Sequence, residues 1–114
     1  MDITTEGTGG PKLDERLLGL NNNIYGDVVG ATDPAEVARA FVSLGWAARR
    51  SADDEFEVEH TWAELTIIPI TPLNFSGVVD PPRAQELLEV FQAAGYQARA
   101  EIYDQSGKCV AVHE

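Results

Sequence analysis

The sequence predicts an α+β fold, a two-layer sandwich in which a mainly antiparallel sheet packs against two helices. Three observations predict it: an internal repeat, an Asp-Pro helix start in each half, and stretches of strand-forming residues around both starts. The repeat has a constant offset of fifty positions, and its pairs are Glu36 and Glu86, Phe41 and Phe91, Gly45 and Gly95, Ala48 and Ala98, and Arg49 and Arg99. We therefore expect two βαββ-like repeats related by a pseudo-twofold axis.

The chain of 114 residues has the length of one domain with its own core. Residues 1–12 are rich in Gly and Thr, and we expect a flexible tail that buries little surface. Residues 13–114 then form a single domain, with the repeats at approximately residues 20–62 and 73–114. The leucines of residues 13–20 favour a short helical turn, although a strand is also compatible with them.

The first repeat begins with a predicted strand over residues 24–29, which are rich in strand-forming side chains. Asp33 is expected to cap a helix that has Pro34 at its first position and Glu36 three residues after the cap. Gly45 should end this helix. Strands are then expected from residue 46 to 50, from 55 to 61 and from 62 to 70, with a polar turn at residues 51–54. Pro69 argues against an unbroken ladder at the end of the third of these strands.

The second repeat follows the same order. A strand is predicted over residues 74–79, Asp80 is expected to cap the second helix behind Pro81, and Gly95 should end that helix. A hairpin should close the domain, with strands over residues 96–103 and 108–113. The predicted order is therefore strand, helix, three strands, strand, helix and two strands.

The net charge is −11, from 19 acidic and 8 basic residues. A negative surface disfavours direct binding to nucleic acid and to anionic membranes, and it attracts basic proteins. Solubility is the alternative reason for such a charge. No secretory signal and no apolar run long enough to span a bilayer is recognised, so we expect a cytoplasmic protein.

The most unusual local pattern is an acidic strand. Glu55, Glu57 and Glu59 should share one face of the strand and Phe56 and Val58 the other. Because like charges repel, we interpret these glutamates as a candidate binding surface for a basic partner, together with Asp53, Asp54 and Trp62. The alternatives are a solvated outer face for the acids and a core position for Trp62. The interpretation also requires that Arg49, Arg50 and Arg99 do not already neutralise these carboxylates.

The sequence shows no assembled catalytic set, so we expect no catalytic residue, no enzyme activity and no cofactor. His60 and His113 are weak candidates for a metal site, because no tight spacing of ligands accompanies them. Cys109 lies in an apolar segment, so we predict that it is a small core residue.

Residues 33–41, with Leu44, Gly45 and Trp46, resemble the first helix of vicinal oxygen chelate proteins, the glyoxalase and bleomycin-resistance group. Those proteins consist of paired βαβββ units. The resemblance implies a dimeric domain that binds a small molecule or metal, with a pocket between the halves lined by His60, Trp62 and Tyr103. The family's first-strand histidine has no counterpart in residues 24–29, and a final strand is missing after His113, so its metal chemistry is not carried over.

Two functional hypotheses remain, beside the third possibility of a plain regulatory or accessory domain. The first is a small acidic binding protein of the immunity or antitoxin type that inhibits a basic toxin or nuclease by covering its active site. The second is the chelate-type domain, with a small-molecule or metal ligand and a homodimeric state. Charge, size and the acidic strand favour the first hypothesis.

Overall fold

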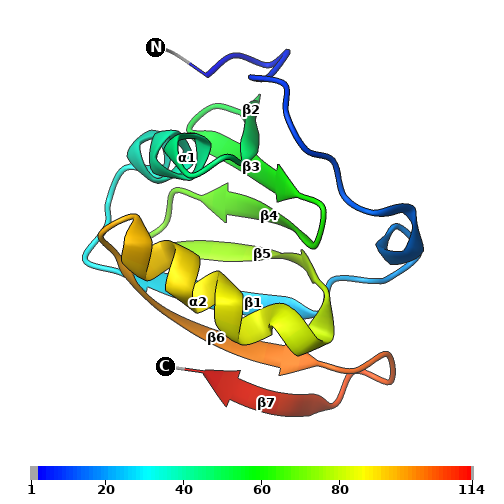
Figure 1. Cartoon of the computed structure of the whole chain (residues 1–114). Coiled ribbons are helices and arrows are strands. Elements are labelled where there is room, and N and C mark those ends of the chain that lie inside the picture. Colours follow the sequence, from blue (N-terminus) through cyan, green and yellow to red (C-terminus); the bar gives the residue numbers. More distant parts are fainter. Residues whose placement is uncertain (1–2, 114) are drawn as a thin grey trace.

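The computed structural model describes residues 3–113. A seven-stranded antiparallel sheet in the order β2-β3-β4-β5-β1-β6-β7 packs against two helices on one face (Figure 1). The strands are β1 (Ile24–Val29), β2 (Ala47–Ala52), β3 (Glu55–His60), β4 (Ala63–Ile68), β5 (Leu73–Val79), β6 (Gln97–Tyr103) and β7 (Cys109–His113). The helices are α1 (Pro34–Ser43) and α2 (Ala84–Ala93), and short 3-10 turns, η1 (Glu15–Leu17) and η2 (Pro81–Arg83), precede β1 and α2. The predicted fold class and the predicted order of strands and helices are confirmed.

The two repeats are connected differently in the sheet. Their first strands, β1 and β5, are antiparallel neighbours at its centre. The chain passes through α1 across β5, β4 and β3 to reach β2, whereas it passes through α2 across β1 alone to reach β6. The structure therefore does not confirm the repeat as an architecture with a pseudo-twofold axis.

The two helix starts also differ. Asp33 caps α1 as predicted, because its Oδ1 accepts a hydrogen bond of 2.9 Å from Ala35 N, and Pro34 is the first helical residue. The predicted cap at Asp80 is wrong: η2 follows it, and α2 begins only at Ala84. The physical reason is Pro82, which lacks the N–H group that a capping carboxylate at Asp80 would use.

The core lies between the helices and the sheet. Phe91 is at its centre, with its ring centroid 5.0 Å from those of both Phe41 and Phe75, and all three side chains are fully buried. Each helix therefore contributes one phenylalanine to a cluster that the sheet completes from β5. Neither helix in the described part of the chain is long and apolar enough to cross a membrane.

Residues 3–8 run along the outer edge of β2. Ile3 is only 6% exposed and belongs to the main core, so the expectation that residues 1–12 bury little is wrong at this position. Arg50 N donates to Thr4 O at 2.9 Å, and Thr8 N donates to Ala48 O at 2.9 Å. This segment and residues 9–12 after it are here called the N-terminal strap, in which Thr4 and Thr8 satisfy backbone groups of β2 that would otherwise face solvent.

Residues 13–20 continue from the strap to the other face of the sheet. They contain the predicted short helical turn, η1, and Leu13 and Leu17 form a small second core with Val78. At the entry to β1, the buried Asn23 side chain extends the ladder to β5. Its Oδ1 accepts from Val79 N at 2.9 Å, and its Nδ2 donates to Val79 O at 2.8 Å.

Candidate functional site

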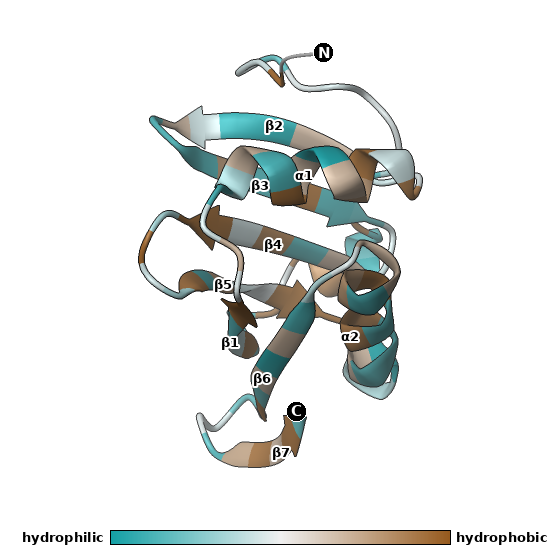
Figure 2. Cartoon of the chain, turned by 90° about the vertical axis from the view of Figure 1, so that its left-hand side faces the viewer, coloured by the Kyte–Doolittle hydropathy of each residue, from teal (hydrophilic) through white to brown (hydrophobic). Residues whose placement is uncertain are grey.

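The sheet face that the helices leave uncovered is largely polar. Strand register places one row of side chains across it, because paired residues of antiparallel strands point to the same face. The row consists of Arg49, Glu57, Thr66, Ser76, Tyr25, Glu101 and Val112. Hydrophilic residues make up much of the ribbon of β2 and β3, whereas most residues of β7 are hydrophobic (Figure 2).

Four glutamates form what we call the acidic face: Glu55, Glu57 and Glu59 on β3 and Glu64 on β4. The predicted alternation of β3 is confirmed, since the side chains between the glutamates, Phe56 and Val58, are buried in the core. Glu64 lies directly opposite Glu59 in the register of the two strands. The sheet therefore presents carboxylates from two neighbouring strands to the same side.

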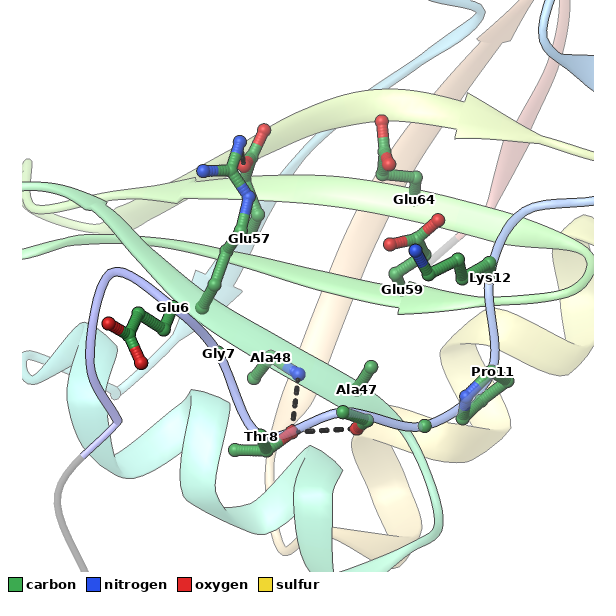
Figure 3. Close-up of a pocket in the computed structure, with 13 residues that line it drawn as sticks. Glu6, Gly7, Thr8, Pro11, Lys12, Ala47, Ala48, Glu57, Glu59 and Glu64 are labelled. Carbon is green, nitrogen blue, oxygen red and sulfur yellow. Dashed lines mark hydrogen bonds and ion pairs between the residues drawn. The ribbon is translucent and has the colours of Figure 1, made fainter.

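A pocket of about 260 Å³ opens between the acidic face and the N-terminal strap (Figure 3). Residues 6–12 form one wall and Ala47, Ala48 and Arg49 of β2 form the other, while three glutamates of the acidic face line its base. Thr8 holds the strap to β2, because its Oγ1 accepts from Ala48 N at 3.1 Å. Carboxylates stabilise ammonium and guanidinium groups, and the chain's own Lys12 and Arg49 are among the residues that line this concave site.

The carboxylates of the pocket have different partners. Arg49 Nη2 forms an ion pair with Glu57 Oε2. Glu59 Oε2 accepts a hydrogen bond of 2.7 Å from Leu13 N, which joins the acidic face to the segment before η1. Burial raises the pKa of the Glu64 carboxyl, and the negative charges of Glu59 and Glu57 raise it further. An added cation beside Glu64 would offset this burial and repulsion.

The requirement that the chain's own arginines leave the acids free is met only in part. Arg49 pairs with Glu57, and Arg50 Nη2 lies 2.9 Å from Asp53 Oδ1. Arg99 pairs instead with Asp27 on another part of the sheet. The hypothesis of a surface made entirely of unmatched acids is therefore wrong for Glu57 and Asp53.

Asp53 and Asp54 occupy the turn between β2 and β3. Asp54 has a positive φ of 56°, a conformation that aspartate tolerates better than most residues. Both side chains are exposed, and neither lines the pocket. Their positions in the turn explain why aspartates occur here, and neither residue belongs to the candidate site.

Trp62 is a core residue and lies outside the acidic face. It is 5% exposed, its ring centroid is 5.4 Å from that of Trp46, and the guanidinium carbon of Arg83 lies 4.5 Å from its ring centroid. Tyr103 contacts Tyr25 on the uncovered face, at a centroid distance of 5.5 Å. The structure therefore does not form the pocket of His60, Trp62 and Tyr103 that the chelate-type hypothesis expects.

His60 and His113 do not converge. His60 packs against Trp46 at a centroid distance of 5.2 Å, while Nδ1 of His113 lies 2.9 Å from Gln85 Oε1. Burial lowers the pKa of His60, and the charge of Arg83 lowers it further. Across residues 3–113, no group of three or more His, Cys, Asp or Glu side chains has the arrangement of a metal site. Cys109 is exposed on β7, so its predicted packing role is wrong.

Sequence reasoning missed two parts of the candidate site. Glu64 stands between Ala63 and Leu65, in a stretch that reads as an interior strand, and only the register of β3 and β4 reveals its position opposite Glu59. The strap that forms the pocket wall gives little local signal, because residues 6–12 have the composition of a loop. Alternation within β4 is the one signal that places Glu64 on the polar face.

Comparisons with family models, with curated proteins and with solved structures give no match to this chain.

Proposed function

We propose that this chain is a small, acidic, non-catalytic binding protein of the immunity or antitoxin type, which inhibits a basic toxin or nuclease. The observation that carries the proposal is the pocketed acidic face, where Glu57, Glu59 and Glu64 line one concave site. Only Glu57 of these three has an arginine partner among the described residues. A lysine or arginine side chain of the partner would enter the pocket and neutralise Glu64.

The net charge of −11 supports the same proposal. A strongly negative protein steers a basic partner toward itself and accelerates association, and this effect weakens as salt screens the charges. Inhibition would follow from covering the active site of the partner, which requires no catalytic group on this chain.

The test compares two double variants with the same net charge. Glu55→Lys with Glu64→Lys changes the acidic face and keeps Glu59, whose carboxylate holds Leu13 N. Glu36→Lys with Glu89→Lys changes the helices instead. Each pair of reversals raises the charge by 4, from −11 to −7. The wild-type protein is used to capture a basic protein from the source cells, and inhibition of the captured protein's nuclease or toxic activity is measured.

We expect the acidic-face variant to bind the captured protein at least about tenfold more weakly, because two repulsive charges enter the interface. The helix variant should keep most of the affinity. Equal losses of affinity in the two variants would mean that the net charge alone causes the effect. A captured protein whose activity is not inhibited would refute the inhibitor function.

A further inference from the structure

A second concavity lies at the end of the sheet where β1 begins, β6 ends and the turn to β7 follows (Figure 1). Its volume is about 500 Å³, within the roughly 300–1,000 Å³ of small-molecule sites. Tyr25 of β1 and Tyr103 of β6 line it, together with residues 20–23 and parts of the turn at residues 104–107. A smaller hollow of about 370 Å³ also has Tyr25 in its wall and continues along β1 to Asp27. Because Tyr25 belongs to both hollows, we call them together the tyrosine site.

The two tyrosine rings offer an apolar contact surface. Their centroids are 5.5 Å apart and their planes are at 85°, so at least one face of each ring is free of the other ring. Tyr25 is 44% exposed, and the hydroxyl of Tyr103 donates to Glu101 Oε2 at 2.7 Å. The rings contact each other and leave no slot between them for a proline ring or a flat base. A ligand therefore meets the outer face of a ring.

The polar groups beside the rings include neutral amides with unused hydrogen-bonding capacity. Asn21, Asn22 and Gln105 line the larger hollow, and their side chains form no hydrogen bond with another described residue. Asn23 differs, because both ends of its amide are held by the backbone of Val79. A free amide can donate and accept at the same time, as a hydroxyl group also does.

The charge of the larger hollow disfavours an anionic ligand. Among the described residues, its lining contains no Lys or Arg and one acid, Asp104. Oδ1 of Asp104 accepts from the Ser106 hydroxyl, Lys108 N and Ser106 N at 2.6, 3.0 and 2.9 Å, and these hydrogen bonds lower the pKa of the aspartate. The carboxylate is thus ionised and held by its own turn. An apolar ligand is disfavoured as well, because it would remove water from the amides without replacing their hydrogen bonds.

We propose that the tyrosine site binds a neutral oligosaccharide, a function that goes beyond the inhibitor function and does not depend on it. A sugar ring has C–H groups on its faces and hydroxyls around its rim. One face can pack on Tyr25 while the hydroxyls exchange hydrogen bonds with the amides. The smaller hollow accommodates a further sugar unit. Asn74 lines it beside Asp27 and Arg99, whose charges neutralise each other in an ion pair of 3.1 Å.

The first test measures binding of the full chain to an array of neutral oligosaccharides. The sugar that binds most tightly is then titrated into the protein and followed by NMR, with adenosine and a proline-rich peptide titrated in parallel. We expect the sugar to shift the backbone amides of residues 21–25 and 103–107. Three results would overturn the proposal: no binding to any neutral oligosaccharide of the array, sugar-induced shifts only elsewhere, or shifts at the tyrosine site only with adenosine or the peptide.

The second test removes the ring of Tyr25. Tyr25→Ala should weaken sugar binding at least about tenfold, because the apolar contact is lost, whereas Tyr25→Phe keeps the ring and should keep most of the affinity. Val29→Ala is the matched control, since Val29 is an exposed residue of β1 that lines neither hollow. The same affinity for Tyr25→Ala and wild-type protein would overturn the proposal.

A gentler variant tests the amides without removing an aromatic ring. Asn22→Asp keeps the shape of the side chain and removes its N–H donors, and we expect it to weaken sugar binding about fivefold or more. Gln92→Glu makes the same chemical change at an exposed position of α2 and should bind like wild type. Equal affinities of these two variants would overturn the proposed contacts.

The salt dependence separates this proposal from the inhibitor function. An uncharged sugar should bind equally well at low and high salt, whereas binding of a basic partner to the acidic face should weaken. The variant with Glu55→Lys and Glu64→Lys should bind the sugar like wild type, because neither residue lines the tyrosine site. A sugar affinity that falls steeply with salt would overturn the assignment of a neutral ligand. Failure of the inhibitor test would leave these sugar measurements unchanged.

Discussion

At the scale of single residues, the surroundings of each carboxylate determine its role. Asp80 is buried and accepts a hydrogen bond of 2.7 Å from Arg16 Nη2, and this hydrogen bond lowers the pKa of the aspartate. Glu64 accepts no such hydrogen bond from the described residues, and burial raises its pKa. Two acids of one chain therefore shift in opposite directions, because an arginine donates to Asp80 whereas burial and the charges of Glu59 and Glu57 dominate at Glu64.

Replacing Glu64 by glutamine should stabilise the fold at neutral pH. A pKa raised in the folded state means that the ionised carboxyl opposes folding, and this penalty disappears as the pH falls through the folded-state pKa. Relief of the repulsion by Glu59 should increase the free energy of unfolding by about 0.2–1 kcal/mol. Urea unfolding should show the gain at neutral pH and its disappearance in acid.

The matched control is Glu89→Gln, which removes an exposed carboxylate from α2. It should not reproduce the pH-dependent gain. A Glu64→Gln protein that is less stable than wild type at neutral pH would show that this carboxylate already has a stabilising partner.

At the scale of the elements, the two edge strands of the sheet differ in whether their outward N–H and C=O groups have partners. The edge of β2 is covered by the N-terminal strap, whereas no segment within residues 3–113 pairs with the outer edge of β7. The strap is anchored by Ile3, whose side chain enters the core between α1 and the edge of the sheet. The burial of one apolar side chain thus adds to the hydrogen bonds of Thr4 and Thr8 in holding a Gly-rich segment against the sheet.

Replacing Ile3 by alanine should detach the strap from β2. The loss of a buried isoleucine costs about 2–5 kcal/mol when the site cannot collapse, and the strap's exposed position favours the lower end of this range. Thermal unfolding should show the loss, and hydrogen exchange should accelerate at Arg50 N and Thr8 N. Thr5→Ala, at an exposed position of the same segment, is the control. Unchanged exchange at both amides would show that the strap holds without Ile3.

At the scale of the whole molecule, the charge is unbalanced even after the internal ion pairs are formed. Five arginines form ion pairs with acidic side chains, and all five lie outside α1: Arg16, Arg49, Arg50, Arg83 and Arg99. The 19 acids still exceed the 8 basic residues, so the folded chain repels itself.

Sodium chloride should therefore raise the melting temperature of the protein, because it screens this repulsion. The variant with Glu36→Lys and Glu89→Lys has a net charge of −7 and should show a smaller rise than wild type, whose charge is −11. A melting temperature that falls with salt would show that the ion pairs outweigh the repulsion between acids.

The sequence by itself determined the order of strands and helices, the cap at Asp33 and the alternation of β3. These features depend on residues that are close in the chain, where spacing and capping chemistry act directly. Only the tertiary structure decided that Glu64 faces Glu59, that Trp62 belongs to the core, that Arg49 neutralises Glu57 and that the strap forms a pocket. Strand register and long-range packing bring these residues together. Patterns among neighbouring residues in the sequence do not determine which distant residues face each other across strands.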